Sequence, residues 1–314
     1  MFIAAVGAAF VETFLQNTVK NRELTPMERA TLANLYENTY CLSLRFKVSY
    51  NYRLRQSHSN LIKELQNLRN YTEITERLKN LELPIKLAGN VHGDENISYP
   101  IHQIHLASST DTSHPVLITG GVHGDEPAGV EAVLQFLERD NTARLKQFSF
   151  TIIPCINPYG YVHETRETRN DIDINRSFET DNVPEVAIVK KALRQTQFAF
   201  AIDFHEDYEA TGFYLYEGKR DEKYIGPQLA TAAKAIGPVD PEDTDKEAPN
   251  YVEGVYKVAT EWGTEGLAPY LLHFHSKHVI ISETPTVWQL ERRATLHLTI
   301  LDTALDIISE MNEN

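Results

Sequence analysis

The pentapeptide VHGDE occurs twice, at 91–95 and 122–126, and each copy sets a histidine three positions before a glutamate. That spacing can bring two metal ligands to one side of a turn, but it does not distinguish the two copies. Only the second copy follows an apolar, strand-like run and a Gly-Gly pair and precedes a proline suited to a helix start. We therefore predict His123 and Glu126 as metal ligands and the first copy as a surface turn.

A catalytic zinc ion takes three protein ligands and keeps one position open. We predict His205 as the third ligand, because it directly follows the apolar run 198–204. Asp203 lies on the same side of that strand and can accept a hydrogen bond from the other ring nitrogen. Glu283 follows a second apolar run, 278–282, where its carboxylate can act as a general base. Two imidazoles and one carboxylate suit one zinc ion per chain.

Three arginines fall within eleven positions, namely Arg166, Arg169 and Arg176, and Asn175 directly precedes the last of them. A guanidinium group can bind a carboxylate through two hydrogen bonds and can stabilise a developing oxyanion. Acidic residues are interleaved with these arginines: Glu164, Glu167, Asp171 and Asp173. A surface cluster of salt bridges is therefore the alternative interpretation of this segment.

A second histidine cluster lies in the sequence LLHFHSKH and comprises His273, His275 and His278. The spacing is compatible with metal binding, but the apolar and polar residues alternate as at the beginning of a strand. We favour the structural interpretation.

The chain from residue 85 onward alternates between apolar runs and amphipathic segments. We expect strands at 100–106, 115–119, 148–153, 198–204, 212–216 and 278–282. We expect helices at 127–138, 184–196, 224–236 and 288–311. This alternation predicts an α/β fold with a mixed, largely parallel central sheet flanked by helices.

The net charge of the sequence changes sign near Pro84. Residues 1–83 carry a net charge of +3, and the remaining residues carry −17. We predict a mainly helical N-terminal region at 1–84, with one possible strand at 42–54, followed by a catalytic domain at 85–314. The function and any partner of the N-terminal region stay open.

Composition excludes several classes of protein. The 314 residues carry a net charge of −14, which disfavours binding to nucleic acid or to an anionic membrane surface. No apolar run reaches the length of a membrane span. Two cysteines cannot form a disulfide framework, so we expect a reducing compartment, the cytoplasm.

Five segments together resemble the zinc carboxypeptidase (carboxypeptidase A-like) superfamily, which includes the succinylglutamate desuccinylase and aspartoacylase branch. In chain order they are GGVHGDEPAG, INPYGY, TRNDIDINRSF, AIDFHED and VIISETP. The segment NRSF departs from the usual NRNF of the peptidases. The tyrosine that peptidases bring over the substrate cannot be placed, since Tyr251, Tyr256 and Tyr270 are all possible.

The resemblance implies a role for each predicted site residue. His123, Glu126 and His205 would bind zinc, and Glu283 would be the general base. Arg169 would polarise the scissile carbonyl, with Arg166 as the alternative occupant of that position and a further substrate-binding residue. Asn175 and Arg176 would hold the substrate carboxylate.

The expected function is zinc-dependent hydrolysis of an amide bond next to a free carboxylate, in the manner of a carboxypeptidase. An N-acyl amino acid deacylase of the desuccinylase type is the first alternative, with the same metal and arginines on a smaller substrate. A non-catalytic binding protein on the same fold is the second. The acidic stretch 239–247 could favour basic substrates, although a solvated surface is the simpler interpretation.

Overall fold

The computed structural model describes residues 69–93, 97–110, 113–220, 223–240, 250–258 and 262–313. Most of the predicted N-terminal region, including the strand expected at 42–54, lies outside the described residues, and the boundary at residue 84 stays a prediction. Residues Tyr71–Asn314 group into one compact unit. Within the described part of the chain, no helix combines the length and the apolar character needed to cross a bilayer.

The described residues form one nine-stranded sheet. Its strands are β1 (Ile85–His92), β2 (Ser98–Leu106), β3 (His114–Gly120), β4 (Phe148–Ile153), β5 (Phe200–Asp207), β6 (Tyr214–Lys219), β7 (Asn250–Val252), β8 (Val255–Lys257) and β9 (His278–Pro285). The helices are α4 (Tyr71–Lys79), α5 (Pro127–Glu138), α6 (Pro158–His163), α7 (Pro184–Leu193), α8 (Gly226–Ala233), α9 (Leu267–Phe274) and α10 (Leu290–Glu313), with 3₁₀ turns at Arg144–Lys146 and Ile174–Arg176.

Spatial order in the sheet is β1-β2-β4-β3-β5-β9-β6-β8-β7. The central strands β4, β3, β5 and β9 are parallel, and antiparallel pairs join β1, β2 and β7 to their neighbours and β6 to β9. The chain leaves β3 for β4 on one side and returns to β5 on the other side. The carboxyl end of β3 is therefore a topological switch point, where open α/β sheets place their ligands.

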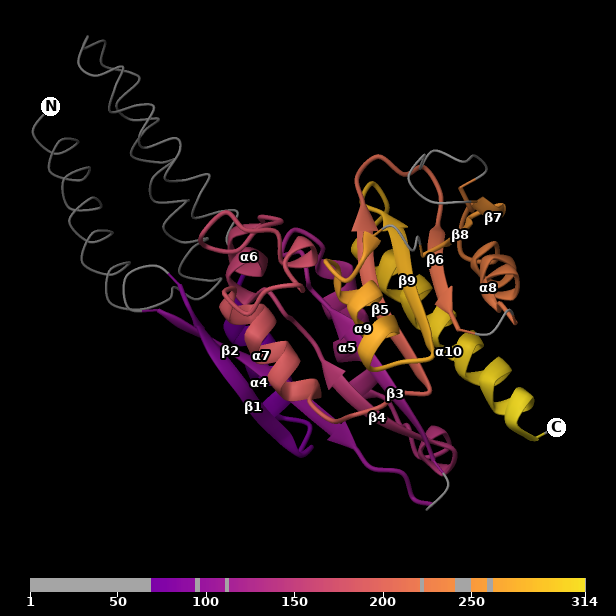
Figure 1. The fold of residues 1–314 in the computed structure, drawn as a ribbon, viewed down its shortest axis with the longest axis horizontal. Coiled ribbons are helices and arrows are strands. Elements are labelled where there is room, and N and C mark those ends of the chain that lie inside the picture. Colours follow the sequence, from indigo (N-terminus) through magenta and orange to yellow (C-terminus); the bar gives the residue numbers. More distant parts are fainter. Residues whose placement is uncertain are drawn as a thin grey trace, which may run out of the picture. The chain divides into compact units, whose positions relative to one another are not determined.

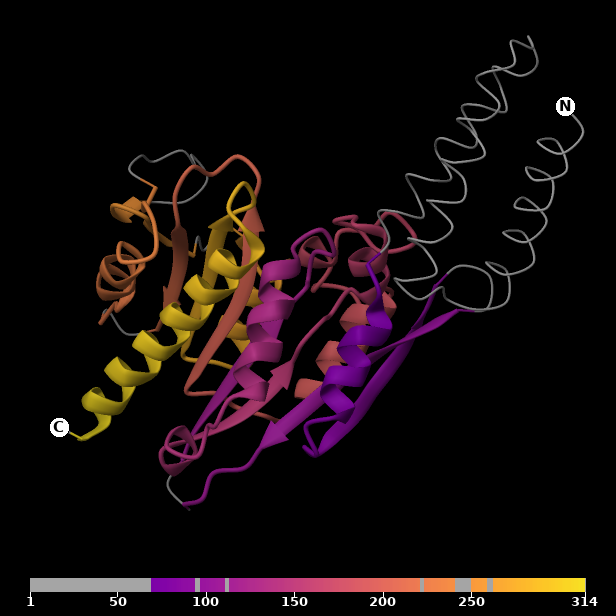
Figure 2. The same cartoon turned by 180° about the vertical axis from the view of Figure 1, so that it is seen from behind.

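Helices cover both faces of the sheet. Helices α6, α7 and α9 lie on the face nearer the viewer in Figure 1, and α4, α5 and α10 lie on the opposite face, seen in Figure 2. Strands β3 and β5 are buried between these layers, which explains why their sequences are nearly continuous apolar runs. The predicted mixed sheet with a parallel centre is confirmed.

All six expected strands and four expected helices are present, with their ends shifted by up to three residues. Strand β1 was missed because its side chains are mostly half-buried or exposed and give no clear alternation. The strand-like interpretation of LLHFHSKH holds only for its last residue, His278, which begins β9, because the first four residues belong to helix α9. The first VHGDE copy begins inside β1 with Val91 and His92, and its last two residues lie outside the described part of the chain.

Candidate metal centre

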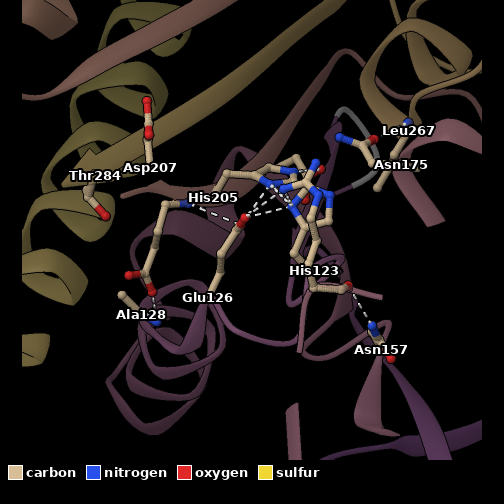
Figure 3. Close-up of polar contacts among 12 residues, drawn as sticks. His123, Glu126, Ala128, Asn157, Asn175, His205, Asp207, Leu267 and Thr284 are labelled. Carbon is tan, nitrogen blue, oxygen red and sulfur yellow. Dashed lines mark hydrogen bonds and ion pairs between the residues drawn. The ribbon is translucent and has the colours of Figure 1, made fainter. Parts of the chain in front are cut away.

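Three predicted ligands converge at the carboxyl ends of β3 and β5 (Figure 3). One ligand atom from each of His123, Glu126 and His205 lies within 4.8 Å of the other two. The Nδ1 atoms of the two imidazoles are 3.2 Å apart. The Glu126 carboxylate lies 2.6 Å from Nδ1 of His123 and 2.9 Å from Nδ1 of His205. All three side chains are buried, so the cluster is a shielded set of two nitrogen donors and one oxygen donor.

The turn after β3 fixes the first two ligands. Gly121 has φ +61°, a conformation that glycine adopts without strain, and it turns the chain out of the strand. A Cβ atom on Gly124 would stand 1.9 Å from the carbonyl carbon of Gly160, so the turn packs backbone to backbone against α6. Glu126 then occupies the N-cap position of α5, directly before Pro127.

Each imidazole is also held at its second nitrogen. Asp203 lies 2.8 Å from Nε2 of His205, as expected, and accepts a hydrogen bond from the hydroxyl of Thr119 at 2.7 Å. Asp173 lies 3.3 Å from Nε2 of His123. Carboxylates in this position fix the tautomer and raise the basicity of a metal-binding imidazole.

Asp173 was missed as a site residue, because its interleaving with arginines looked like an exposed salt-bridge cluster. Its position two residues before Asn175 is the signal that could have identified it, since its side chain caps the turn Ile174–Arg176. The 3₁₀ turn directs the carboxylate back towards His123.

We call His123, Glu126 and His205 together the ligand cluster. Their pKa values depend on burial and on the charges of neighbouring groups. Burial alone would raise the pKa of Glu126, but the imidazoles of His123 and His205 lower it to about 2. Burial opposes protonation of both imidazoles, yet the carboxylates around them raise their pKa values. A divalent cation must displace these protons, so its affinity should fall as the pH falls.

These donors fit a zinc ion. Imidazole nitrogen and carboxylate oxygen are its usual ligands, and the second nitrogen of each ring is already occupied by Asp203 or Asp173.

The structure brings Arg166, not Arg169, to the ligand cluster. Nη1 of Arg166 lies 3.1 Å from Nδ1 of His123, and its Nε donates to Asp173 at 3.1 Å. Arg169 is exposed and does not line the cavity. Backbone hydrogen bonds between Thr168 and the residues after Arg169 close a tight turn, which projects Arg169 towards solvent. The resemblance placed Arg169 first for polarising the carbonyl, but this turn leaves Arg166, and not Arg169, beside the ligand cluster.

Asn175 and Arg176 also line the cavity. The Oδ1 atom of Asn175 accepts a hydrogen bond from the backbone nitrogen of Leu267 at 2.8 Å, at the first residue of α9. This contact orients the amide so that its NH2 group remains the donor for a ligand. Arg176 is exposed and keeps one guanidinium hydrogen bond to the Asn175 carbonyl.

Glu283 lies on β9, in register with His205 on β5. Its side chain lines the same cavity as the three ligands. Burial raises the pKa of Glu283 well above its usual range; the charge of His205 opposes this rise, and the carboxylate of Glu126 adds to it. A bound divalent cation would lower this pKa and return the carboxylate to a form that can accept a proton.

The cavity around these groups has a volume of about 470 Å³. Besides the ligand cluster, its walls include the tyrosines Tyr208, Tyr214 and Tyr216. Of the tyrosines considered from the sequence, Tyr256 and Tyr270 do not line it, and the side chain of Tyr251 lies outside the described residues.

The second histidine cluster has structural roles. His278 contacts Glu217 at 2.7 Å, and that carboxylate also accepts hydrogen bonds at the N-terminus of α8. His275 contacts the Thr196 carbonyl and the Tyr270 hydroxyl. Among the described residues, His123, Glu126 and His205 are the only group of ligand type close enough to hold a metal ion together.

Comparisons with known proteins identify one matching family and several similar folds. Residues 113–238 match the succinylglutamate desuccinylase/aspartoacylase catalytic domain. Among curated proteins, no sequence matches the chain.

Several solved structures share the fold. One is a Shewanella denitrificans OS217 protein provisionally described as a metallopeptidase, with a TM-score of 0.63 and 20% identity over 74% of this chain and 87% of that chain. Another is a metallo-carboxypeptidase from Burkholderia cenocepacia, with a TM-score of 0.55 and 19% identity over 75% and 68% of the two chains. A metallo-carboxypeptidase from Pseudomonas aeruginosa, in complex with (2-guanidinoethylmercapto)succinic acid, has a TM-score of 0.55 and 15% identity over 76% and 68%.

Proposed function

Because the chain has the fold of the zinc carboxypeptidase-like superfamily and matches its desuccinylase/aspartoacylase branch over residues 113–238, we propose that it is a zinc-dependent hydrolase. It cleaves an amide bond next to a free carboxylate. The observation that carries the proposal is the buried convergence of His123, Glu126 and His205 beside Glu283 and Arg166 in one cavity. The proposal includes a cytoplasmic location, which rests on the scarcity of cysteine.

His123, Glu126 and His205 hold the zinc ion, with Asp203 and Asp173 fixing the two imidazoles. When bound, zinc supplies Lewis-acid polarisation and lowers the pKa of water.

The remaining residues of the site bind the substrate and transfer the proton. Arg166 donates hydrogen bonds to the oxygen that gains negative charge as the amide is attacked. Glu283 accepts the proton of the attacking water and passes it to the leaving amine. Asn175 and Arg176 bind the substrate carboxylate, which fixes the amide relative to Glu283.

A deacylase that acts on N-acyl amino acids is the second candidate, and the match of residues 113–238 to the desuccinylase/aspartoacylase domain favours it specifically. Both activities need the same zinc ligands and carboxylate-binding groups. The size of the opening near 240–256 would separate them, but residues 241–249 lie outside the described part of the chain. Assays with a C-terminally free peptide and with the matching N-acyl amino acid distinguish the two candidates directly.

Metal content tests the proposal first. The purified protein is dialysed with trace zinc, then against metal-free buffer, and analysed by elemental mass spectrometry. We expect about one zinc ion per chain, lost in His123→Ala and His205→Ala and retained in His92→Ala. His92 is a matched control, because it lies in the other VHGDE copy and is exposed at the end of β1. Absence of retained zinc in the unmodified chain contradicts the proposed function and leaves a non-catalytic binding protein as the better hypothesis.

A further inference from the structure

We propose that Glu206 is a positioning residue for the metal centre. Its buried side chain, paired with Arg293, ties the start of α5 to the end of β5. This tie sets the separation of Glu126 and His205 before a metal ion binds. The inference rests on the proposed function, because it takes these two residues as zinc ligands.

Helix α5 begins without a capping hydrogen bond from its own N-cap side chain. Glu126 occupies the N-cap position, but its carboxylate contacts the imidazoles of the ligand cluster and makes no capping hydrogen bond. Pro127 has no N–H group, so Ala128 carries the first backbone donor of the helix. A buried backbone donor of this kind needs an acceptor from elsewhere in the chain.

Glu206 supplies that acceptor from β5, 78 positions away. Its Oε1 atom accepts a hydrogen bond from the backbone nitrogen of Ala128 at 2.5 Å, and Figure 3 shows Ala128 near Glu126. The backbone nitrogen of Glu206 donates in the opposite direction, to Oε2 of Glu126 at 3.1 Å. Two hydrogen bonds therefore join the same two segments, and one of them ends on a proposed zinc ligand.

The two segments pack so closely that this link controls their spacing. A Cβ atom on Gly129 would stand 2.8 Å from the carbonyl oxygen of Phe204. The backbone of α5 thus lies directly against β5, at the residue before His205. Because Glu126 precedes the helix and His205 continues the strand, a shift between the two segments would change the distance between the two ligands.

Arg293 of α10 holds the Glu206 carboxylate in place. The Glu206 side chain is fully buried, and its Oε2 atom forms an ion pair with Arg293. A buried carboxylate needs such a partner, because it has lost its hydration. Helix α10 packs against both α5 and β9, so the ion pair connects the helices to the strand that carries His205.

A second ion pair joins α10 to the opposite end of α5. Arg139, the C-cap residue of α5, binds Asp302 through two hydrogen bonds of 2.7 Å. The twelve residues of α5 separate this pair from the ligand cluster by about 18 Å. It is therefore a matched control, with the same helices and the same kind of contact away from the metal centre.

The test compares two double variants that both remove the Glu206–Arg293 ion pair. Glu206→Gln with Arg293→Met keeps a side-chain oxygen that can accept the hydrogen bond from Ala128, whereas Glu206→Leu with Arg293→Met has none. The two variants carry the same net charge, so the comparison separates the hydrogen bond from the electrostatics of the site. Competition with a chelator measures the zinc affinity of the full chain, and thermal unfolding of the metal-free chain measures stability separately.

The glutamine variant should bind zinc about as tightly as the unmodified chain. The leucine variant should bind zinc at least about tenfold more weakly, because no side chain fixes the start of α5 relative to His205. The control, Arg139→Met with Asp302→Leu, should leave zinc affinity unchanged even where it lowers the unfolding temperature. Glu206→Asp should also weaken zinc binding, since it keeps the charge but is one methylene too short to reach both partners.

Two results overturn the inference: equal zinc affinities in the two double variants, or a loss in the control as large as the loss in the leucine variant. If the leucine variant fails to fold, Glu206→Asp decides, and an unchanged affinity there overturns the inference. The proposed function stands in each of these cases, because the unmodified chain still binds zinc. An unmodified chain that binds no zinc contradicts the proposed function, and this inference fails with it.

Discussion

His297 of α10 is buried behind the candidate site and should make the protein sensitive to acid. Its Nδ1 lies 2.9 Å from the hydroxyl of Ser282 and its Nε2 lies 3.2 Å from that of Thr284. These two residues flank Glu283 on β9, and the imidazole also packs on Phe204 with the ring centroids 4.7 Å apart. Burial lowers the pKa of His297 from 6.5 to about 3, and the charge of His205 acts in the same direction.

The sign of the effect follows from the difference in bound protons. Between pH 6.5 and about 3, the unfolded chain carries a proton on this imidazole and the folded chain does not. The neutral, buried imidazole of His297 therefore makes its full contribution to the free energy of unfolding above pH 6.5. This contribution decreases as the pH falls from 6.5 towards about 3. At pH 5, which is 1.5 pH units below the pKa in the unfolded chain, the free energy of unfolding is lower by about 2 kcal/mol.

Urea unfolding of the unmodified chain and of His297→Gln, at pH 7.5 and at pH 5, isolates this contribution. The variant should be less stable at pH 7.5, because it disturbs hydrogen bonds to two buried hydroxyls. The difference in free energy of unfolding between the unmodified chain and the variant should be about 2 kcal/mol smaller at pH 5. The reason is that the variant lacks the imidazole that is protonated in the unfolded chain. The exposed His92→Gln serves as the control and should show no such change. A deficit that is equal at both pH values would refute the reasoning.

Three further substitutions test the site. Glu283→Gln should abolish turnover while zinc content stays at the unmodified level, and an active variant would remove Glu283 from the role of base. Asp203→Asn should weaken zinc affinity about 10- to 100-fold in a chelator competition, because the imidazole of His205 loses its carboxylate; unchanged affinity would contradict that role. Gly124→Ala should lower both thermal stability and zinc retention, because its methyl group would overlap the backbone of Gly160; normal retention would show that the turn can shift.

The sequence was sufficient to predict the central strands and the meeting of His123, Glu126 and His205, because their signals are local. Strands β3 and β5 are buried on both faces and therefore appear as short apolar runs. A polar residue that ends such a run must lie at the sheet edge, which places His205 without knowledge of the fold. The Gly-Gly pair and the following proline distinguish the two VHGDE copies for a similar reason.

Features that depend on residues distant in the sequence could not be predicted without the tertiary structure. The choice between Arg166 and Arg169 depends on a tight turn that projects one arginine outward, and both have the same local sequence signal. Helix α9 was misinterpreted because histidines alternate with apolar residues around its C-terminal end. The backbone nitrogen of its first residue, Leu267, donates a hydrogen bond to Asn175, which lies 92 positions earlier.

The sequence by itself determined the residue types of the three predicted ligands and the strand ends near which they lie, since periodicity and chain direction are properties of neighbouring residues. The tertiary structure alone decided what surrounds them. Tyr216 and Trp262, whose rings meet edge to face at the cavity, and His297, behind Glu283, lie far apart in the chain. Their proximity depends on how β6, β9 and α10 pack, and packing is set by the summed burial of many side chains, which no single segment encodes.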